Sequence, residues 1–179
     1  LVIEYNEIYN VSLLSNDSGG IFVRDSNMII RNNLIHDVYS PGEGTPGWGI
    51  YLGCESRNSE IRNNVVYRTR DSLHMLWGNR HNVIENNIFV DAQRYVLSSH
   101  NSEQFVHTDV VLRRNILAFK GDETRMARIL GERSLVTESD YNIWFPAKGQ
   151  QMIIEHLPGV EDYDAWRERG YEAHSVVAD

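Results

Sequence analysis

Residues 84–90 read Ile-Glu-Asn-Asn-Ile-Phe-Val, and this phrase of an apolar residue, two variable positions, an asparagine and a short apolar run recurs along the chain. Two further full copies begin at Ile30 and Ile61, and three weaker copies complete the series. Successive asparagines of the phrase are 27, 31, 23, 28 and 27 residues apart: Asn6, Asn33, Asn64, Asn87, Asn115 and Asn142. A repeat of about 20–50 residues is typical of a solenoid.

The repeats contain strands and no helices of useful length. Each copy has a polar turn, a short β-branched strand with the asparagine, and then a second strand. Strands without crossover helices predict an all-β parallel β-helix, with about six rungs in residues 1–145. Asparagines stacked at one corner would bond to neighbouring rungs, so we interpret them as a structural ladder rather than as catalytic groups.

The second strands supply a candidate surface. They are predicted at 20–23, 49–52 and 73–76, and less clearly at 95–98 and 128–130. Alternation directs one set of side chains to the core: Ile21, Val23, Ile50, Leu52, Leu73 and Met75. The intervening residues Phe22, Tyr51 and His74 are then expected to form one outward column.

The repeat stops after Asn142, and residues 146–179 are predicted to cap the solenoid within the same domain. Residues 162–170 indicate a short helix with an acidic start and a glycine stop. Two longer loops, at 39–48 and 100–109, are expected to wall a binding groove.

Composition narrows the range of partners. The net charge of −8 argues against nucleic acid and anionic membranes. Fifteen of the 17 basic residues are arginines, which suit acidic sugars, although a codon bias would give the same excess. The single cysteine, Cys54, excludes an internal disulfide. The chain opens on a strand without Met, so we expect a segment of a longer protein. Further rungs before Leu1, or a second copy of the chain, are expected to cover its open N-terminal face.

Several motifs resemble the right-handed parallel β-helix proteins of the pectate-lyase-like superfamily, which act on polysaccharides. These motifs are the Asn-Asn phrase, the stretches at 17–22 and 49–52, and the tail at 166–179. The resemblance implies a right-handed coil in a secreted or periplasmic bacterial protein that binds a polysaccharide or oligosaccharide. Similar proteins often carry acidic residues directly after the second strand, where this chain has Gly53 and Cys54.

Aromatic, acidic and basic residues gather near the predicted column, and a sugar ring needs this combination of groups. The catalytic candidates are Asp17, Glu55 and His74. The candidates for substrate binding are Arg24, Tyr51, Trp77, Arg80 and His81. Structural interpretations remain open: Asp17 can cap the Gly19-Gly20 turn, and Tyr51 and Trp77 can simply cover the sheet.

Three functions are compatible with this site. The first is a glycoside hydrolase, in which Asp17 and Glu55 divide the acid and base roles and His74 assists. The second is a lyase of uronate polymers, in which arginine neutralises the substrate carboxylate. The third is a glycan-binding or structural β-helix without chemistry. No cofactor is expected; acidic loops are compatible with Ca²⁺, but no ligand set stands out.

Overall fold

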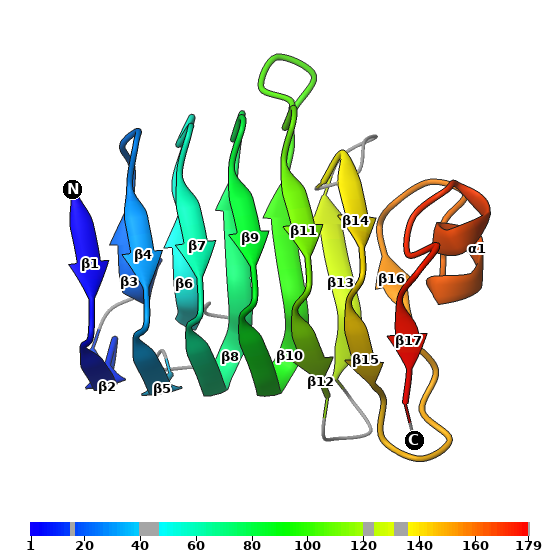
Figure 1. The fold of residues 1–179 in the computed structure, drawn as a ribbon, viewed down its shortest axis with the longest axis horizontal. Helices are drawn as coiled ribbons and strands as arrows, with labels where there is room; N and C mark the ends of the chain where they lie inside the picture. Colours follow the sequence, from blue (N-terminus) through cyan, green and yellow to red (C-terminus); the bar gives the residue numbers. More distant parts are fainter. Residues whose placement is uncertain (15–16, 40–46, 120–123, 131–135, 179) are drawn as a thin grey trace.

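A computed structural model of the chain shows a parallel β-solenoid whose rungs stack along one long axis (Figure 1). The structure describes residues 1–14, 17–39, 47–119, 124–130 and 136–178. The chain starts at one end of the axis and finishes near the other, beside the short helix α1 (Figure 1). The predicted all-β class and the parallel β-helix are therefore confirmed.

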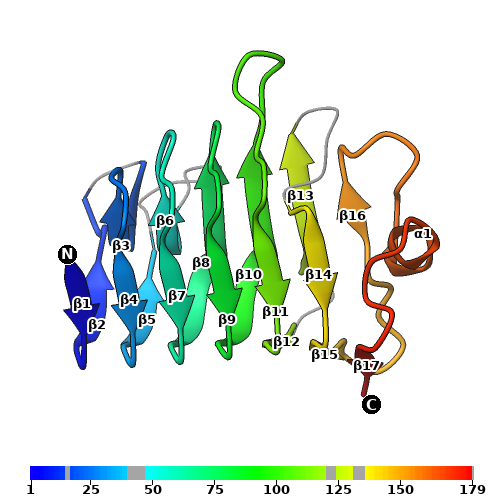
Figure 2. The same cartoon turned by 45° about the horizontal axis from the view of Figure 1, so that its top comes forward.

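The first sheet is formed by the short strands that precede the asparagines. Every pairing in it is parallel and joins one rung to the next, as Ile30↔Ile61 and Ile61↔Ile84 do. Its six strands, in spatial order, are β1 (Val2–Glu4), β4 (Ile29–Arg31), β7 (Glu60–Arg62), β9 (Val83–Glu85), β11 (Val111–Arg113) and β14 (Glu138–Asp140). The same order can be followed in both views of the ribbon (Figure 2).

The six repeated asparagines form the predicted ladder at the corner after this sheet. The side-chain oxygen of Asn87 accepts from the backbone N–H and the side-chain amide of Asn64, both at 3.0 Å. The Asn87 amide donates to Ile61 O at 2.8 Å. The same pattern recurs from rung to rung, so a column of amides satisfies buried backbone groups that a turn would otherwise leave unpaired.

The second sheet has eleven strands and covers the other two faces of the solenoid. One row follows the ladder: β2 (Glu7–Val11), β5 (Leu34–Val38), β12 (Ile116–Ala118), β15 (Ile143–Phe145) and β17 (Val176–Val177). A second row carries the predicted second strands: β3 (Ser18–Val23), β6 (Gly47–Leu52), β13 (Arg125–Leu130) and β16 (Ile154–Glu155). The two long strands pass through both rows and join them: β8 (Val65–Leu76) and β10 (Ile88–His100).

Where the chain bends between these rows, two successive residues face the core. In β8 they are Ser72 and Leu73, both fully buried, and in β6 they are Gly49 and Ile50. A side chain at Gly49 has no room, because a Cβ there would lie 2.3 Å from Val66 Cγ1. The bend shifts the in–out alternation of the strand by one residue. The two outward-facing residues that flank the bend are therefore three positions apart in the sequence.

One core runs the length of the solenoid. The side chains predicted to face inward are all buried in it: Ile21, Val23, Ile50, Leu52, Leu73 and Met75. Stacked aliphatic side chains of this kind supply most of the stabilisation, at about 25 cal/mol per Å² of apolar surface removed from water.

The C-terminal segment closes the last rung. The predicted helix is confirmed as α1 (Tyr163–Glu168), and Asp162 caps it by accepting from the backbone N–H of Ala165 at 2.9 Å. Trp166 is buried and stacks on Tyr171 with ring centroids 4.3 Å apart. Strands β16 and β17 pair with β13 and β15, so sheet pairing continues past residue 145 into this segment.

Of the two predicted loops, only one is largely described. Residues 40–46 of the loop at 39–48 lie outside the described residues. The loop between β10 and β11 projects from the solenoid (Figure 1), and its Phe105 stacks on Trp77 at 6.5 Å. In the described part of the chain, no helix has the length and apolar character needed to cross a membrane.

Candidate functional site

The outward column predicted on the second strands is present. Parallel register places Phe22 beside Tyr51 and Tyr51 beside His74. The column continues over the next two rungs through Ser98 and Arg128. Five successive rungs therefore present aromatic, basic and hydroxyl groups along one line.

A second outward line lies three residues earlier in each strand, on the other side of the bend. Trp48 pairs with Asp71, and Asp71 pairs with Tyr95. The indole of Trp48 stacks on the His74 ring, with centroids 4.4 Å apart and planes at 15°. The two lines thus converge into one site.

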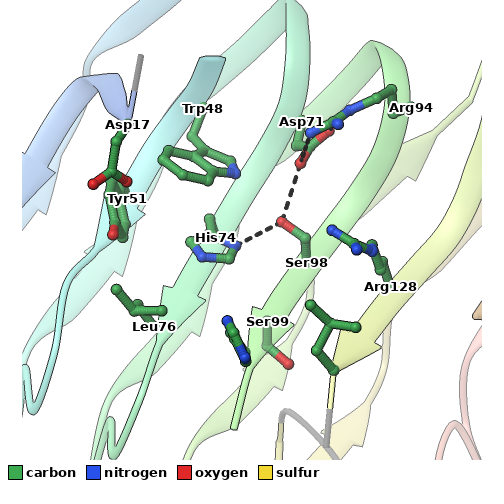
Figure 3. Close-up of a pocket in the computed structure, with 12 residues that line it drawn as sticks. Asp17, Trp48, Tyr51, Asp71, His74, Leu76, Arg94, Ser98, Ser99 and Arg128 are labelled. Carbon is green, nitrogen blue, oxygen red and sulfur yellow. Dashed lines mark hydrogen bonds and ion pairs between the residues drawn. The ribbon is translucent and has the colours of Figure 1, made fainter. Parts of the chain in front are cut away.

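Between the two lines the surface is hollowed into a pocket of about 250 Å³ (Figure 3). Its walls come from four rungs and from the residue before β3. The lining residues are Asp17, Trp48, Tyr51, Asp71, His74, Leu76, Arg94, Ser98, Ser99, His100, Arg128 and Leu130.

The Asp71 carboxylate is the most buried charged group of the pocket, with 2 % of the residue exposed. Arg94 holds it with two parallel bonds, at 3.0 Å from Nε to Oδ1 and at 2.9 Å from a terminal nitrogen to Oδ2. Burial raises the pKa of Asp71, while the Arg94 guanidinium, Ser98 and Trp48 oppose the rise by favouring the ionised form. The carboxyl group is therefore able to hold a proton that an exposed aspartate would release.

His74 is connected to this carboxylate through a hydroxyl. Ser98 Oγ lies 2.8 Å from His74 Nδ1 and 3.3 Å from Asp71 Oδ2, as the dashed lines in Figure 3 show. Burial lowers the pKa of His74 to about 3, and the neighbouring basic groups His107, His100, Arg128 and Arg94 lower it further. The imidazole is thus neutral near pH 7, with one nitrogen carrying a proton and the other a lone pair.

The second ring nitrogen of His74, Nε2, has no bonding partner among the described residues. Because Nδ1 is engaged with Ser98, Nε2 is the atom that remains for a ligand in the pocket. A neutral imidazole in this setting exchanges a proton with whatever lies against Nε2.

Arg128 differs from Arg94 in its pairing. Arg94 is fixed by Asp71, whereas Arg128 makes no ion pair with any described residue; its guanidinium lies 5.9 Å from the Tyr95 ring centroid. The Arg128 side chain extends beside Ser98 (Figure 3). It is therefore a cation in the pocket wall that is available to a negative group of a ligand.

Asp17 and Tyr51 form the opposite wall. Asp17 adopts a left-handed backbone conformation with φ of 55° directly before β3, at the pocket mouth. Burial raises the pKa of the Tyr51 phenol, and the nearby Asp17 carboxylate raises it further. Tyr51 is therefore a neutral hydrogen-bonding group, and it stacks against Phe22 with centroids 4.4 Å apart.

The structure brings three of the predicted site residues together, Asp17, Tyr51 and His74. Trp77 is one contact away, since its ring meets His100 edge-on at 5.6 Å. The other predicted residues lie outside the lining of this pocket: Arg24, Glu55, Arg80 and His81.

Each of these four has a separate position. Arg24 follows β3, and a Cβ at Gly53 would lie 3.2 Å from its Cβ. Glu55 is exposed in the turn after β6, where its N–H donates to Trp77 O at 2.7 Å. The backbone of Arg80 forms an isolated parallel β-bridge with the backbone of Arg57. His81 Nδ1 lies 3.3 Å from the carboxylate of Asp109. Their predicted roles are not supported by a place in the pocket.

Nine lining residues were not predicted as site residues: Trp48, Asp71, Leu76, Arg94, Ser98, Ser99, His100, Arg128 and Leu130. Ser98 and Arg128 lie on the two second strands that the sequence predicts less clearly, at 95–98 and 128–130. Extending the predicted outward column to these two strands would have identified both residues. Within the described residues, no three histidine, cysteine or acidic side chains gather closely enough to hold a metal ion.

A parallel β-solenoid of this kind defines a class of proteins, the β-helix proteins. A family model described as a right handed beta helix region matches residues 1–119, so the chain belongs to this family. The right-handed coil expected from the resemblance is thereby confirmed. Comparison with curated proteins and with solved structures gave no match.

Proposed function

We propose that this pocket binds one or more sugar rings of a polysaccharide and hydrolyses a glycosidic bond. The observation that carries the proposal is the convergence of a carboxylate, a neutral histidine and an aromatic wall in one hollow. The edges of the buried Trp48 and Tyr51 rings line the hollow, and the charged groups around them can bond to hydroxyls of a sugar. This is the combination on which sugar recognition depends.

Hydrolysis requires a proton for the leaving oxygen and a carboxylate on the other side of the sugar. In the proposed reaction His74 Nε2–H donates the proton while Nδ1 takes up a proton from the Ser98 side, so that the ring does not become an anion. Asp17 activates water or attacks the anomeric carbon. The proposal assigns Glu55 no role, because it lies outside the pocket. Tyr51, whose raised pKa keeps its hydroxyl protonated, donates a hydrogen bond to the substrate.

Asp17→Asn and His74→Gln test the assignment. Each removes one acid–base group with little change in size, so we expect kcat to fall about 100-fold or more for a glycan that the protein cleaves. Glu60→Gln is the matched control, since Glu60 is an exposed carboxylate of the first sheet that pairs with Arg62 at 3.3 Å, outside the pocket. Full activity of both Asp17→Asn and His74→Gln would remove the hydrolase assignment.

Arg128 favours a second candidate reaction, the elimination cleavage of a uronate polymer. A cation without an ion-pair partner among the described residues can neutralise the substrate carboxylate, which acidifies the neighbouring C–H. His74 Nε2 would then act as the base. The product of elimination is unsaturated and absorbs in the near ultraviolet, whereas hydrolysis gives reducing ends without this absorption.

Arg128→Gln separates the two reactions. For a uronate lyase we expect kcat/KM to fall about 100-fold or more, because the charge stabilises the transition state. For a hydrolase of neutral glycans the change should be less than about 10-fold. Arg57→Gln, an exposed arginine of the turn before β7, serves as the control.

A further inference from the structure

We infer that His74, Ser98 and Asp71 act as one acid–base unit, in which the proton exchanged at His74 Nε2 is stored on Asp71. The geometry of the three side chains carries this inference, which rests on the proposed function only for its role in turnover. Ser98 Oγ is the single atom between the imidazole, at 2.8 Å, and the carboxylate, at 3.3 Å. A hydroxyl has one proton and two lone pairs, so it donates to one neighbour while it accepts from the other.

Two arrangements of the unit follow from this constraint. In the first, Asp71 is a carboxylic acid that donates to Ser98, Ser98 donates to Nδ1 of His74, and Nε2 carries a proton. In the second, Asp71 is ionised and accepts from Ser98, Ser98 accepts from Nδ1–H, and Nε2 has a lone pair. The two arrangements differ by one proton overall, and the imidazole is neutral in both.

Release of a proton to a leaving group converts the first arrangement into the second. The Nε2 proton goes to the substrate oxygen, the Ser98 proton moves to Nδ1, and the Asp71 proton moves to Ser98 Oγ. The carboxylate left behind is stabilised by the two bonds from Arg94, at 2.9 and 3.0 Å. Uptake of a proton reverses each step, so the unit also serves as a base.

The surroundings of the unit favour this route over an ordinary imidazolium. His74 is 8 % exposed and stacks on Trp48, so an added charge on the ring would be poorly solvated. The charged and titratable groups that face it from neighbouring elements are mostly basic: Asp17, Tyr51, Arg94, His100, His107 and Arg128. Burial and these basic groups lower the pKa of His74 to about 3, while burial moves the pKa of Asp71 upward.

The Ser98–Asp71 distance of 3.3 Å is longer than a typical O–H···O bond of about 2.7–2.8 Å. Such bonds are often long in a free enzyme and shorten when substrate binds. The unit is therefore expected to be most strongly coupled with a sugar in the pocket.

The test is a pH titration of ¹⁵N-labelled histidine by NMR, because the Nδ1 and Nε2 shifts report both charge and tautomer. We expect His74 to stay neutral between pH 4.5 and 8.5 and to change tautomer with one midpoint. Asp71→Asn should abolish this midpoint, Ser98→Ala should uncouple it, and Ser98→Thr should restore it. Ser99→Ala is the control, since its buried hydroxyl has no partner among the described residues, and it should leave the midpoint unchanged.

An imidazolium that forms at His74 with a midpoint near 6.5, or a tautomer that ignores both Asp71→Asn and Ser98→Ala, would overturn the inference. The signal of His36, a buried ring stacked between Tyr9 and Tyr67, reports whether each variant is folded. If a variant loses its fold, the wild-type titration still decides between a tautomer change and an imidazolium.

In an active protein, Ser98→Ala should also shift the pH profile of kcat/KM and lower its maximum about 100-fold. The shared proton and the proposed reaction can fail separately. Glycan cleavage with an independently titrating His74 would remove the unit and leave the reaction. A coupled tautomer change in a protein that cleaves no glycan would leave the unit and remove the reaction.

Discussion

At the residue scale, Asn87 shows how much one ladder asparagine contributes to stability. It is 1 % exposed and makes bonds to Asn64, Asn115, Ile61 and Glu85. Asn87→Ala leaves buried backbone groups unpaired, so we expect a loss of about 3–5 kcal/mol in the free energy of unfolding. Urea unfolding measures this loss.

The preceding residue provides the control. Asn86 is exposed and has φ of 56°, so Asn86→Gly removes the side chain without backbone strain. We expect this change to stay within about 1 kcal/mol. An equal loss for the two variants would contradict the ladder as a stabilising element.

His107 links stability to pH. Burial lowers its pKa to about 4 from an ordinary value of 6.5. As the pH falls below about 6.5, the unfolded chain gains a proton that the folded chain does not, so the stability contributed by the neutral His107 is lost toward pH 4. The free energy of unfolding should fall by up to about 1.4 kcal/mol per pH unit for this one group.

His107→Asn isolates the effect. Nδ1 of His107 accepts a hydrogen bond from the backbone N–H of Asn79 at 3.0 Å. An asparagine side-chain oxygen can accept the same bond, because Asn82 Oδ1 accepts from the backbone N–H of Ser59 one rung earlier. Urea unfolding at several pH values between 5 and 6.5 should give a shallower slope for the variant than for the wild type. Identical slopes would show that His107 titrates normally in the folded chain.

At the element scale, the bends in β6, β8 and β10 explain what could and could not be predicted. Alternation placed Tyr51 and His74 correctly, because both follow the bend. The same rule would put Trp48 and Asp71 in the core, since they stand an odd number of residues from the column. Only the two successive inward residues at the bend, which depend on packing against the neighbouring row, turn them outward.

Gly49 tests the importance of this bend. A Cβ there would lie 2.3 Å from Val66 Cγ1 and 2.7 Å from Ser72 O, so Gly49→Ala forces the bend apart. We expect a loss of about 1–3 kcal/mol, measured by thermal or urea unfolding. Gly149→Asn is the control, because nothing lies within 4 Å of a Cβ there and asparagine tolerates its φ of 79°. A Gly49→Ala variant as stable as this control would mean that the bend adapts freely.

At the scale of the whole molecule, the repeat spacing was sufficient to predict the solenoid and its ladder, and the acidic start and glycine stop of residues 162–170 predicted the closing helix. The pocket was predicted only in part, because its residues come from four rungs and from both sides of a bend. Repeats reveal which positions are equivalent. They do not reveal which side chains reach one another across a corner, as Arg94 reaches Asp71.

Each rung of a solenoid contacts mainly its neighbours, so damage at one end should stay local. Trp166→Ala removes a buried ring of the cap, and we expect a loss of about 3–5 kcal/mol in local stability. In hydrogen exchange, amides of β15, β16 and α1 should lose protection, while those of β4 and β7 keep it. Uniform loss along the axis would show instead that the chain unfolds as a single unit.

We have proposed that the pocket between Asp17 and Arg128 cleaves a glycosidic bond with His74 as the proton carrier. The direct measurement is product formation on a panel of neutral and acidic glycans, followed by reducing ends and near-ultraviolet absorbance, for the wild type and His74→Gln. We expect turnover by the wild type on at least one glycan and a loss of about 100-fold or more in the variant. Cleavage that His74→Gln leaves intact, or glycan binding by the wild type without any turnover, would contradict the proposal.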